Sequence, residues 1–280
     1  MKILIYFLQF IIIGFFFIIF KIIGYKNSSD FGALIGFLFG PIFRSKKIIY
    51  KNLKIAYPTI SDKEIKSITN SMWKNYGRIL SHYMFIKDFR KKNFNKYIEV
   101  EGKNILSEIK KSNKPVIFIS GHFNNFELLA MTLELNGINL SVIYRPLNNI
   151  FLNKIMLKIR KNYICKNQIP KGVSGLKTSL NLFKKGYSIA MMIDQRVSQG
   201  IKVNLFNKPA LTSTIPAQFI KKYNCLVVPV YIERKEKYNF KVKIDRPIKF
   251  ENKYTTIQIS QKLNDWLERK INTNPNQWIW

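Results

Sequence analysis

The side chains best suited to chemistry lie in one short segment, residues 121–127, which reads GHFNNFE. It contains His122, one of only two histidines in the chain, and Glu127. Five helical steps turn about 500°, so the two side chains can meet only if His122 precedes a helix and folds back over its first turn. Glu127 would then accept a hydrogen bond from one imidazole nitrogen, and the other nitrogen would be free to remove a proton.

This pairing is suited to transferring an acyl group to a hydroxyl without a covalent enzyme intermediate. The imidazole would activate the hydroxyl, and the free N–H groups of the helix N-terminus would stabilise the oxyanion that forms. Simpler interpretations stay open at this point. A histidine near a helix start is often a cap or a satisfied surface residue, and Glu127 could be a first-turn acid favoured by the helix dipole.

Five further polar residues are candidates for substrate binding. Arg145 follows a predicted strand, where it could bind a phosphate or carboxylate bidentately or form a surface salt bridge. Arg160 could contact a phosphate or belong to a solvated basic helix face. Asp194 and Gln195 end an apolar strand, where the carboxylate could cap a turn or position Arg145 or an acceptor. Asn149 is a candidate ligand or a helix cap.

Alternating strands and helices are expected to position these residues. Apolar runs predict strands at 115–120, 140–144, 188–193 and 226–232, and 240–248 alternates as an edge strand would. Helical patterns fill the gaps at 125–135, 149–161, 175–185, 215–222 and 256–271. This order predicts an α/β fold with a mixed, largely parallel central sheet flanked by helices. Ligands of such folds bind beyond the carboxyl ends of the strands, where His122 lies.

The N-terminus predicts one transmembrane helix. Residues 3–20 contain no charge and approach the roughly 30 Å thickness of the bilayer's hydrocarbon core. The stretch ends without the small-residue site of a signal peptide, which favours an uncleaved anchor over residues 1–24 and a domain over residues 25–280. More basic residues follow the span than precede it, so the positive-inside rule places the domain in the cytoplasm.

A second apolar stretch, residues 31–43, is too short to span and carries Gly32, Gly36 and Gly40 at intervals of four. This spacing suits close helix packing, an interfacial helix on the membrane, or a buried first helix of the domain. Residues 47–85 predict two helices broken at Tyr57-Pro58, with a capping box at the start of the second. The Trp278 and Trp280 pair is expected in the core or at the membrane interface.

The amino-acid composition argues against some classes of protein and leaves others open. The chain has 280 residues, a formal net charge of +31 and 47% hydrophobic residues, and its 14% aromatics argue against a disordered basic tail. Part of the positive charge is explained by A/T-rich codons, which encode Lys. The remaining positive charge attracts anionic membranes, nucleic acid or an acidic partner. Cys165 and Cys225 form no CxxC pair, which argues against a zinc site and favours a reduced, cytosol-facing chain.

The chain resembles the late acyltransferases of lipid A biosynthesis, the lauroyl and myristoyl transferases related to the glycerolipid acyltransferases. The resemblance covers nearly the whole chain in the family's order. The residues that carry it are the N-terminal anchor followed by KNLKIAYP, then SGHFNNFELLA with its His-x4-Glu, VIYRPLNN at 142–149, Asp194-Gln195 after a strand, and the closing PNQWIW.

This resemblance implies a function. The family takes acyl chains from acyl carrier protein and transfers them to a glucosamine disaccharide lipid precursor at the cytoplasmic face of the inner membrane. Carried over to this chain, His122 is the general base and Glu127 its orienting partner, and neither a metal nor another cofactor is required. The donor protein is acidic and the precursor carries phosphates, so the positive charge has a use without nucleic acid.

Two alternatives remain open from the sequence. The same motif could acylate a glycerophospholipid or another glycolipid. A membrane-tethered basic module that binds nucleic acid or anionic lipid is the alternative from a different class, and it predicts clustered basic residues with exposed aromatics. Lysines are instead spread along the chain, and no nucleic-acid motif is visible.

Overall fold

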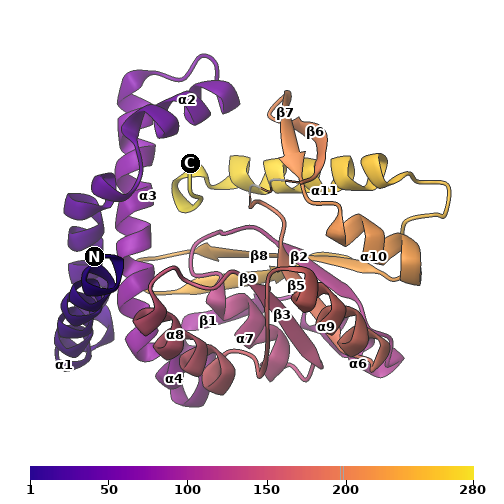
Figure 1. The fold of residues 1–280 in the computed structure, drawn as a ribbon, viewed down its shortest axis with the longest axis horizontal. Helices are drawn as coiled ribbons and strands as arrows, with labels where there is room; N and C mark the ends of the chain where they lie inside the picture. Colours follow the sequence, from indigo (N-terminus) through magenta and orange to yellow (C-terminus); the bar gives the residue numbers. More distant parts are fainter. Residues whose placement is uncertain (196, 198) are drawn as a thin grey trace.

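The protein folds around a seven-stranded mixed sheet (Figure 1). The computed structural model describes residues 1–195, 197 and 199–280. Every pair of neighbouring strands is parallel except β8 and β9, which are antiparallel, so the predicted fold class is confirmed. In sheet order the strands are β1 (Ile98–Glu101), β9 (Phe240–Ile244), β8 (Val227–Arg234), β2 (Ile117–Ser120), β5 (Ser188–Met192), β3 (Leu140–Tyr144) and β4 (Asn167–Pro170).

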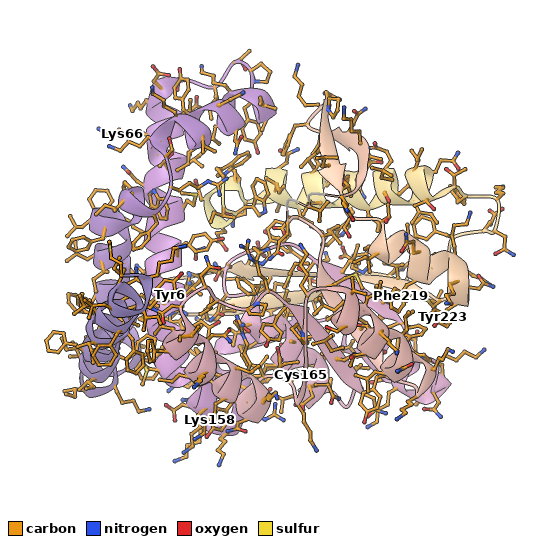
Figure 2. The ribbon with its side chains drawn as sticks, viewed as in Figure 1. Tyr6, Lys66, Lys158, Cys165, Phe219 and Tyr223 are labelled. Atoms are coloured by element: carbon orange, nitrogen blue, oxygen red, sulfur yellow. The ribbon has the colours of Figure 1, made fainter. Side chains whose placement is uncertain are left out.

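The central strands are apolar because helices cover both faces of the sheet. Strand β2 is buried at every residue and lies between β8 and β5. Helices α9 and α10 pack against each other through Phe183 and Phe219, whose ring centroids are 5.6 Å apart. The ring of Tyr223 lies beside Phe219 at a tilt of 40° (Figure 2). The helices of this part are α6 (Lys103–Ser112), α7 (Glu127–Leu135), α8 (Ile150–Tyr163), α9 (Val173–Lys184), α10 (Ile215–Tyr223) and α11 (Thr256–Thr273).

Strand β9 is not the edge strand that its alternating sequence predicts. It lies between β1 and β8, and β1 is the edge. The alternation has a different cause: one face of β9 is buried, and the other carries lysines that pair with acids on β1. Lys241 contacts Glu101 at 2.7 Å, and Lys243 contacts the same carboxylate at 2.9 Å. A half-solvated strand therefore shows period-two patterning whether or not it has a neighbour on both sides.

The remaining elements connect these layers. Helix α1 (Lys2–Phe43) bends at Gly24, whose φ of 78° and ψ of 168° interrupt the helical geometry. Helices α2 (Lys46–Ala56) and α3 (Asp62–His82) follow, with the predicted break at Tyr57-Pro58 and the predicted capping box between Ser61 and Glu64. The others are η1 (Tyr83–Phe85), α4 (Ile86–Asp88), η2 (Phe89–Asn93), α5 (Phe94–Tyr97), the antiparallel hairpin β6 (Ile201–Leu205) and β7 (Lys208–Thr212), and η3 (Pro275–Gln277).

The glycines of α1 pack closely against α3, which is one of the arrangements that their spacing suits. A Cβ at Gly32 would lie 2.5 Å from the carbonyl oxygen of Gly77, and a Cβ at Gly40 would overlap the ring of Trp73. The opposite face of this half of α1 is apolar and exposed, with Leu38 and Ile42 among its members. This half of α1 is therefore a helix that packs tightly on one side only.

The first half of α1 is a candidate membrane span. Its most apolar 18-residue window has a mean hydropathy of 2.8 and is only 6% buried. Within the described residues it is the one helix that is long and apolar enough to cross a bilayer. Phe7 packs against Phe151 of α8, with ring centroids 5.7 Å apart. The division into an anchor of residues 1–24 and a domain of residues 25–280 stays a prediction.

Candidate active site

The site forms where the neighbouring strands β2 and β5 end. Their register pairs Ser120 with Met192, so His122 and Asp194, each two residues further on, meet beyond the carboxyl edge of the sheet. The Nδ1 atom of His122 lies 2.7 Å from Oδ1 of Asp194, and the backbone N–H of His122 donates to Oδ2 at 2.6 Å. Gly121 permits this approach, because a Cβ there would lie 3.1 Å from Oδ2 of Asp194 and 2.8 Å from the ring of Phe123.

Asp194 is a buried, fully engaged carboxylate. Its side chain is 1% exposed, and Oδ2 also accepts a hydrogen bond from Nε1 of Trp278 at 2.8 Å. Burial by itself would raise the pKa of Asp194, but His122 and the hydrogen bonds outweigh it and hold the pKa below its usual value. Asp194 is therefore ionised at neutral pH.

His122 is shifted in the opposite direction. Burial would lower the pKa of His122, but the charge and the hydrogen bond of Asp194 outweigh burial and raise the pKa above its usual value. With Nδ1 donating to Asp194, the lone pair of the neutral imidazole lies on Nε2. The amide Nε2 of Gln195 contacts that atom at 3.2 Å. His122 thus has the tautomer and the support that a general base requires.

The predicted hydrogen bond between Glu127 and His122 is not formed, because Glu127 has other partners. Glu127 is the first residue of α7 and 6% exposed, and its Oε1 accepts from Nε and Nη2 of Arg160 at 2.9 and 2.5 Å. The hydroxyl of Tyr83 donates to the same oxygen. Asp194, carried by the adjacent strand, takes the position beside the imidazole that the sequence assigns to Glu127.

Arg160 is therefore an ion-pair partner of Glu127 and does not belong to a solvated basic face. It is 9% exposed, and its guanidinium also donates to the Tyr83 hydroxyl at 3.2 Å. Burial would lower the pKa of Arg160, but the charge of Glu127 outweighs burial and raises the pKa above its usual value, so the guanidinium stays charged. Its neighbour Lys158, in contrast, points outward from α8 (Figure 2).

Asn149 is a structural residue. Its Oδ1 accepts from the backbone N–H groups of Phe151 and Leu152 at 3.1 and 3.2 Å, so it caps α8. Its Nδ2 donates to the carbonyl oxygen of Tyr6 at 2.8 Å, which ties α8 to α1. The capping interpretation of Asn149 is the one the structure supports. Arg145 is exposed and lines the cavity described next.

A cavity of about 480 Å³ opens beside His122. Polar side chains form one part of its wall: His122, Glu127, Arg145, Arg160 and Gln195. Most of the remaining wall is apolar and comes from β2, α7, β3 and β5, with Phe118, Leu129, Ala130, Leu133 and Met191 among the lining residues. A cavity with a few convergent polar groups and apolar walls suits an amphiphilic ligand with a hydrocarbon chain.

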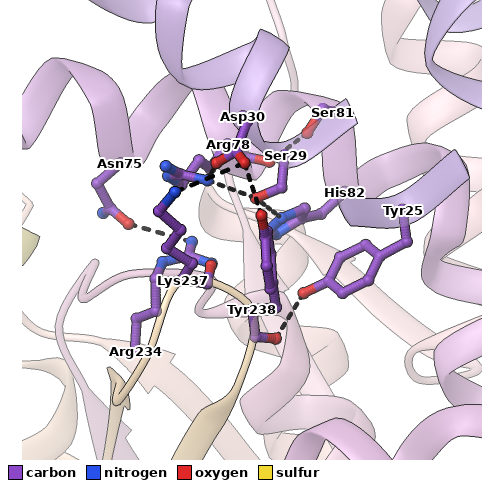
Figure 3. A network of polar contacts seen from close by, with 10 residues as sticks. All are labelled: Tyr25, Ser29, Asp30, Asn75, Arg78, Ser81, His82, Arg234, Lys237 and Tyr238. Carbon is purple, nitrogen blue, oxygen red and sulfur yellow. Dashed lines mark hydrogen bonds and ion pairs between the residues drawn. The ribbon is translucent and has the colours of Figure 1, made fainter. Parts of the chain in front are cut away.

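The second histidine has no such surroundings. His82 is fully buried in a polar network between α1, α3 and the β8–β9 hairpin (Figure 3), and its Nε2 contacts Oγ of Ser29 at 3.1 Å. Burial, together with the charges of Arg234 and Arg78, places the pKa of His82 well below its usual value. His82 is therefore neutral and structural.

Sequence reasoning missed two contributors to the site. Tyr83 follows α3 and reaches Glu127, and Trp278 reaches Asp194 from the C-terminal segment. The closing PNQWIW was recognisable as a motif, but its contact with residue 194 depends on tertiary structure. Within the described residues, there is no group of three or more His, Cys, Asp or Glu side chains that could hold a metal ion.

Comparisons with known proteins agree on a family. A family model described as bacterial lipid A biosynthesis acyltransferase matches residues 1–280. The lipid A biosynthesis acyltransferase 2 of Shigella flexneri is 21% identical over 237 residues, which cover 82% of this chain and 74% of that protein. The lipid A biosynthesis palmitoleoyltransferase of Escherichia coli (strain K12) is 24% identical over 165 residues, 59% of this chain and 53% of that protein.

A solved structure is also similar. The crystal structure of the 1-acyl-sn-glycerophosphate (LPA) acyltransferase PlsC from Thermotoga maritima superposes with a TM-score of 0.43 at 15% identity, covering 92% of this chain and 100% of that one. The family assignment rests on the match to the family model, which spans every residue of the chain. The chain belongs to the bacterial lipid A biosynthesis acyltransferase family.

Proposed function

We propose that the protein transfers a fatty acyl chain from acyl carrier protein to a hydroxyl of a lipid A precursor, with His122 as the general base. One observation carries the proposal: in a chain of this family, a histidine supported by a buried carboxylate lies at the wall of a largely apolar cavity. The imidazole suits proton removal, and the cavity suits the acyl chain.

The reaction follows from the position of the imidazole. Asp194 holds Nδ1–H, and Nε2 removes the proton from the acceptor hydroxyl. The resulting alkoxide attacks the thioester carbonyl carbon, and the tetrahedral oxyanion collapses with cleavage of the carbon–sulfur bond. The imidazolium, stabilised by the Asp194 carboxylate, then protonates the departing thiolate. His122 returns to its neutral form, and the products are an ester and the free thiol of the carrier.

The other polar groups of the wall have separate proposed roles. Exposed Arg145 binds a phosphate of the donor's phosphopantetheine arm or of the acceptor. The Glu127–Arg160 pair keeps a fixed charge distribution beside the reacting atoms without adding net charge. Gln195 contacts Nε2 of His122 in the structure, and it moves aside or reorients when the hydroxyl takes that position.

The same proposal assigns a membrane location. The first half of α1 anchors the protein in the inner membrane as a single span, with the catalytic domain on the cytoplasmic side, where acyl carrier protein is available. The net charge of +31 favours an acidic carrier protein, a phosphorylated lipid and an anionic leaflet. Each CH₂ of the acyl chain that enters the cavity contributes about 0.8 kcal/mol to binding.

The test is lipid A mass spectrometry on a bacterial strain with and without this protein, combined with turnover of acyl carrier thioesters by purified protein. We expect one additional acyl chain on lipid A in the strain that expresses the protein and none in the strain that expresses His122→Ala. The purified enzyme should acylate the disaccharide precursor far faster than a lysophospholipid. Acylation of only the lysophospholipid would support a glycerophospholipid acceptor instead, and absence of any acyl transfer would contradict the proposal.

A further inference from the structure

The C-terminal segment Pro275–Trp280 lies against the catalytic turn. In Figure 1 the chain end lies between α3 and α11, above the sheet. Trp280 fixes the segment there: its side chain is 1% exposed, and its backbone N–H donates to Sδ of Met72 in α3 at 3.4 Å. Its Nε1–H donates to the carbonyl oxygen of Pro275 at 2.8 Å. The buried ring and the backbone contact with Met72 hold the segment, and both are kept in Trp280→Phe.

Trp278 contacts the carboxylate that supports the proposed base. Its indole N–H donates to Oδ2 of Asp194 at 2.8 Å, and the same oxygen accepts the backbone N–H of His122 at 2.6 Å. The side chain of Asp194 is almost fully buried, so every donor it retains matters for keeping the carboxylate ionised and in one orientation. Trp278 does not line the cavity, so it acts on the reaction through Asp194.

Gln277 holds the other side of the turn. Its backbone carbonyl accepts from the N–H of Asn124 at 2.9 Å, and its Oε1 accepts from Nδ2 of Asn124 at 2.6 Å. Asn124 has a φ of 42°, in the left-handed region that is costly for residues other than glycine. The amide of Gln277 also bonds to both backbone groups of Arg234 at the end of β8. Gln277 thereby ties the turn that carries His122 to the sheet.

We propose that Gln277 and Trp278 are positioning residues of the catalytic centre, and that the C-terminal segment holds the His122–Asp194 pair in its reactive geometry. The inference rests on the proposed function of His122. It assigns the PNQWIW motif a role in catalysis beyond packing. Neither residue touches the substrate in this account, so their loss should lower kcat and leave KM nearly unchanged.

The chain offers a matched control for Trp278. Trp278→Phe removes the hydrogen bond to Asp194, and Trp280→Phe removes a similar volume and a hydrogen bond to the backbone, at a more buried position. We expect Trp278→Phe to lower kcat about ten- to a hundredfold, the range for a hydrogen bond to a charged group. Trp280→Phe should keep kcat within about threefold below its melting temperature while losing more thermal stability. Gln277→Leu should lower kcat in the same way as Trp278→Phe.

A spectroscopic signal tests the link independently of turnover. Because the chain has only two histidines, labelling with ¹⁵N-histidine gives signals from His82 and His122 alone. We expect the Nδ1–H resonance of His122 to shift or broaden in Trp278→Phe and to stay unchanged in Trp280→Phe. An unchanged His122 resonance in Trp278→Phe, or an equal loss of kcat in both variants, would overturn the inference. Full activity of His122→Ala would instead overturn the proposed function, while the resonances would still report whether Trp278 positions the pair.

Discussion

The two histidines of this protein lie in buried polar networks and differ in whether a carboxylate contacts the imidazole ring. His82 faces Ser29 and the positive charges of Arg78 and Arg234, and its pKa falls well below the usual value. His122 faces Asp194, and its pKa rises despite burial. Burial alone makes a histidine neutral and inert, whereas burial beside a carboxylate, with one side open to a cavity, makes it a supported base.

Alanine substitutions at the two histidines should differ most strongly in their effect on kcat. His122→Ala is expected to lower kcat about 10³-fold, since it removes the general base, and to lower the free energy of unfolding by about 1–3 kcal/mol, since the buried Asp194 loses one of its hydrogen-bond donors. His82→Ala should keep kcat within about tenfold and lower the free energy of unfolding by about 2–4 kcal/mol, since it leaves a cavity and unpaired groups in the core. Steady-state kinetics and urea unfolding measure both. Equal loss of kcat in the two variants would remove the distinction between the networks.

Breaking the second charged pair of the site should affect stability more than the His122 substitution does. Glu127→Gln leaves the buried guanidinium of Arg160 without its carboxylate, which is expected to cost about 3–5 kcal/mol of folding free energy. The matched control is Asp88→Asn, which breaks an exposed pair with Lys21 and should cost less than about 1 kcal/mol. Chemical unfolding of both variants checks the difference. A small effect of Glu127→Gln would mean that Arg160 finds water or another partner.

The pH dependence of stability should have opposite signs at the two histidines. The raised pKa of His122 contributes stability that is fully present below its unfolded-state value of 6.5 and is lost as pH rises through the folded value. The lowered pKa of His82 means that the unfolded state binds more protons, so stability falls as pH drops below 6.5.

The measurement is the melting temperature from pH 5 to 8. His82→Ala should flatten the acid side of the curve relative to wild type, because the proton taken up on unfolding is gone. Asp194→Asn should lose most stability between about 3.8 and 6.5, the usual pKa values of the two groups that form the pair. Parallel curves for all three proteins would contradict the opposite assignments.

Filling the cavity beside His122 should produce the smallest change, in selectivity. Ala130 lines the cavity from α7 and is 8% exposed. Ala130→Leu should shift the preferred donor to a shorter acyl chain, and each CH₂ excluded should weaken binding by about 0.8 kcal/mol, close to fourfold. Competition between acyl carrier thioesters of different lengths measures this. An unchanged length preference would place the acyl chain elsewhere.

Sequence patterns predicted correctly those elements that are determined by neighbouring residues. The capping box at Ser61, the break at Tyr57-Pro58 and the five predicted strands follow from neighbouring residues, and all are present. Strands β1 (IEVE) and β4 (NQIP) were missed because they are short and polar and gain their order from the adjacent strand. The role of β9 as an inner strand was missed for a different reason: its half-solvated face gives the alternation that is typical of an edge strand.

In the candidate site, too, the contacts between residues distant in sequence could not be predicted. His122 was found because its turn has a local signature, but its partner was assigned to the nearest acid in sequence. The carboxylate that contacts it is 72 positions away and arrives because β2 and β5 are neighbours. Strand order is a property of the whole sheet, so Asp194 could be recognised as a candidate from its strand end but not paired. Trp278 depends on the packing of the chain end, which has no local signal.

The pH profile of acyl transfer shows directly whether His122, held by Asp194, is the base. It requires kcat/KM for an acyl carrier thioester and the lipid A precursor, measured from pH 5 to 9 in the wild type and in Asp194→Asn. We expect a rate that rises with pH through an apparent pKa above 6.5 in the wild type, since His122 must be neutral to act as a base. Asp194→Asn should be at least about a hundredfold slower, because an amide favours the wrong tautomer. A wild-type pKa below 6.5, or an Asp194→Asn enzyme as fast as the wild type, would contradict this role of His122.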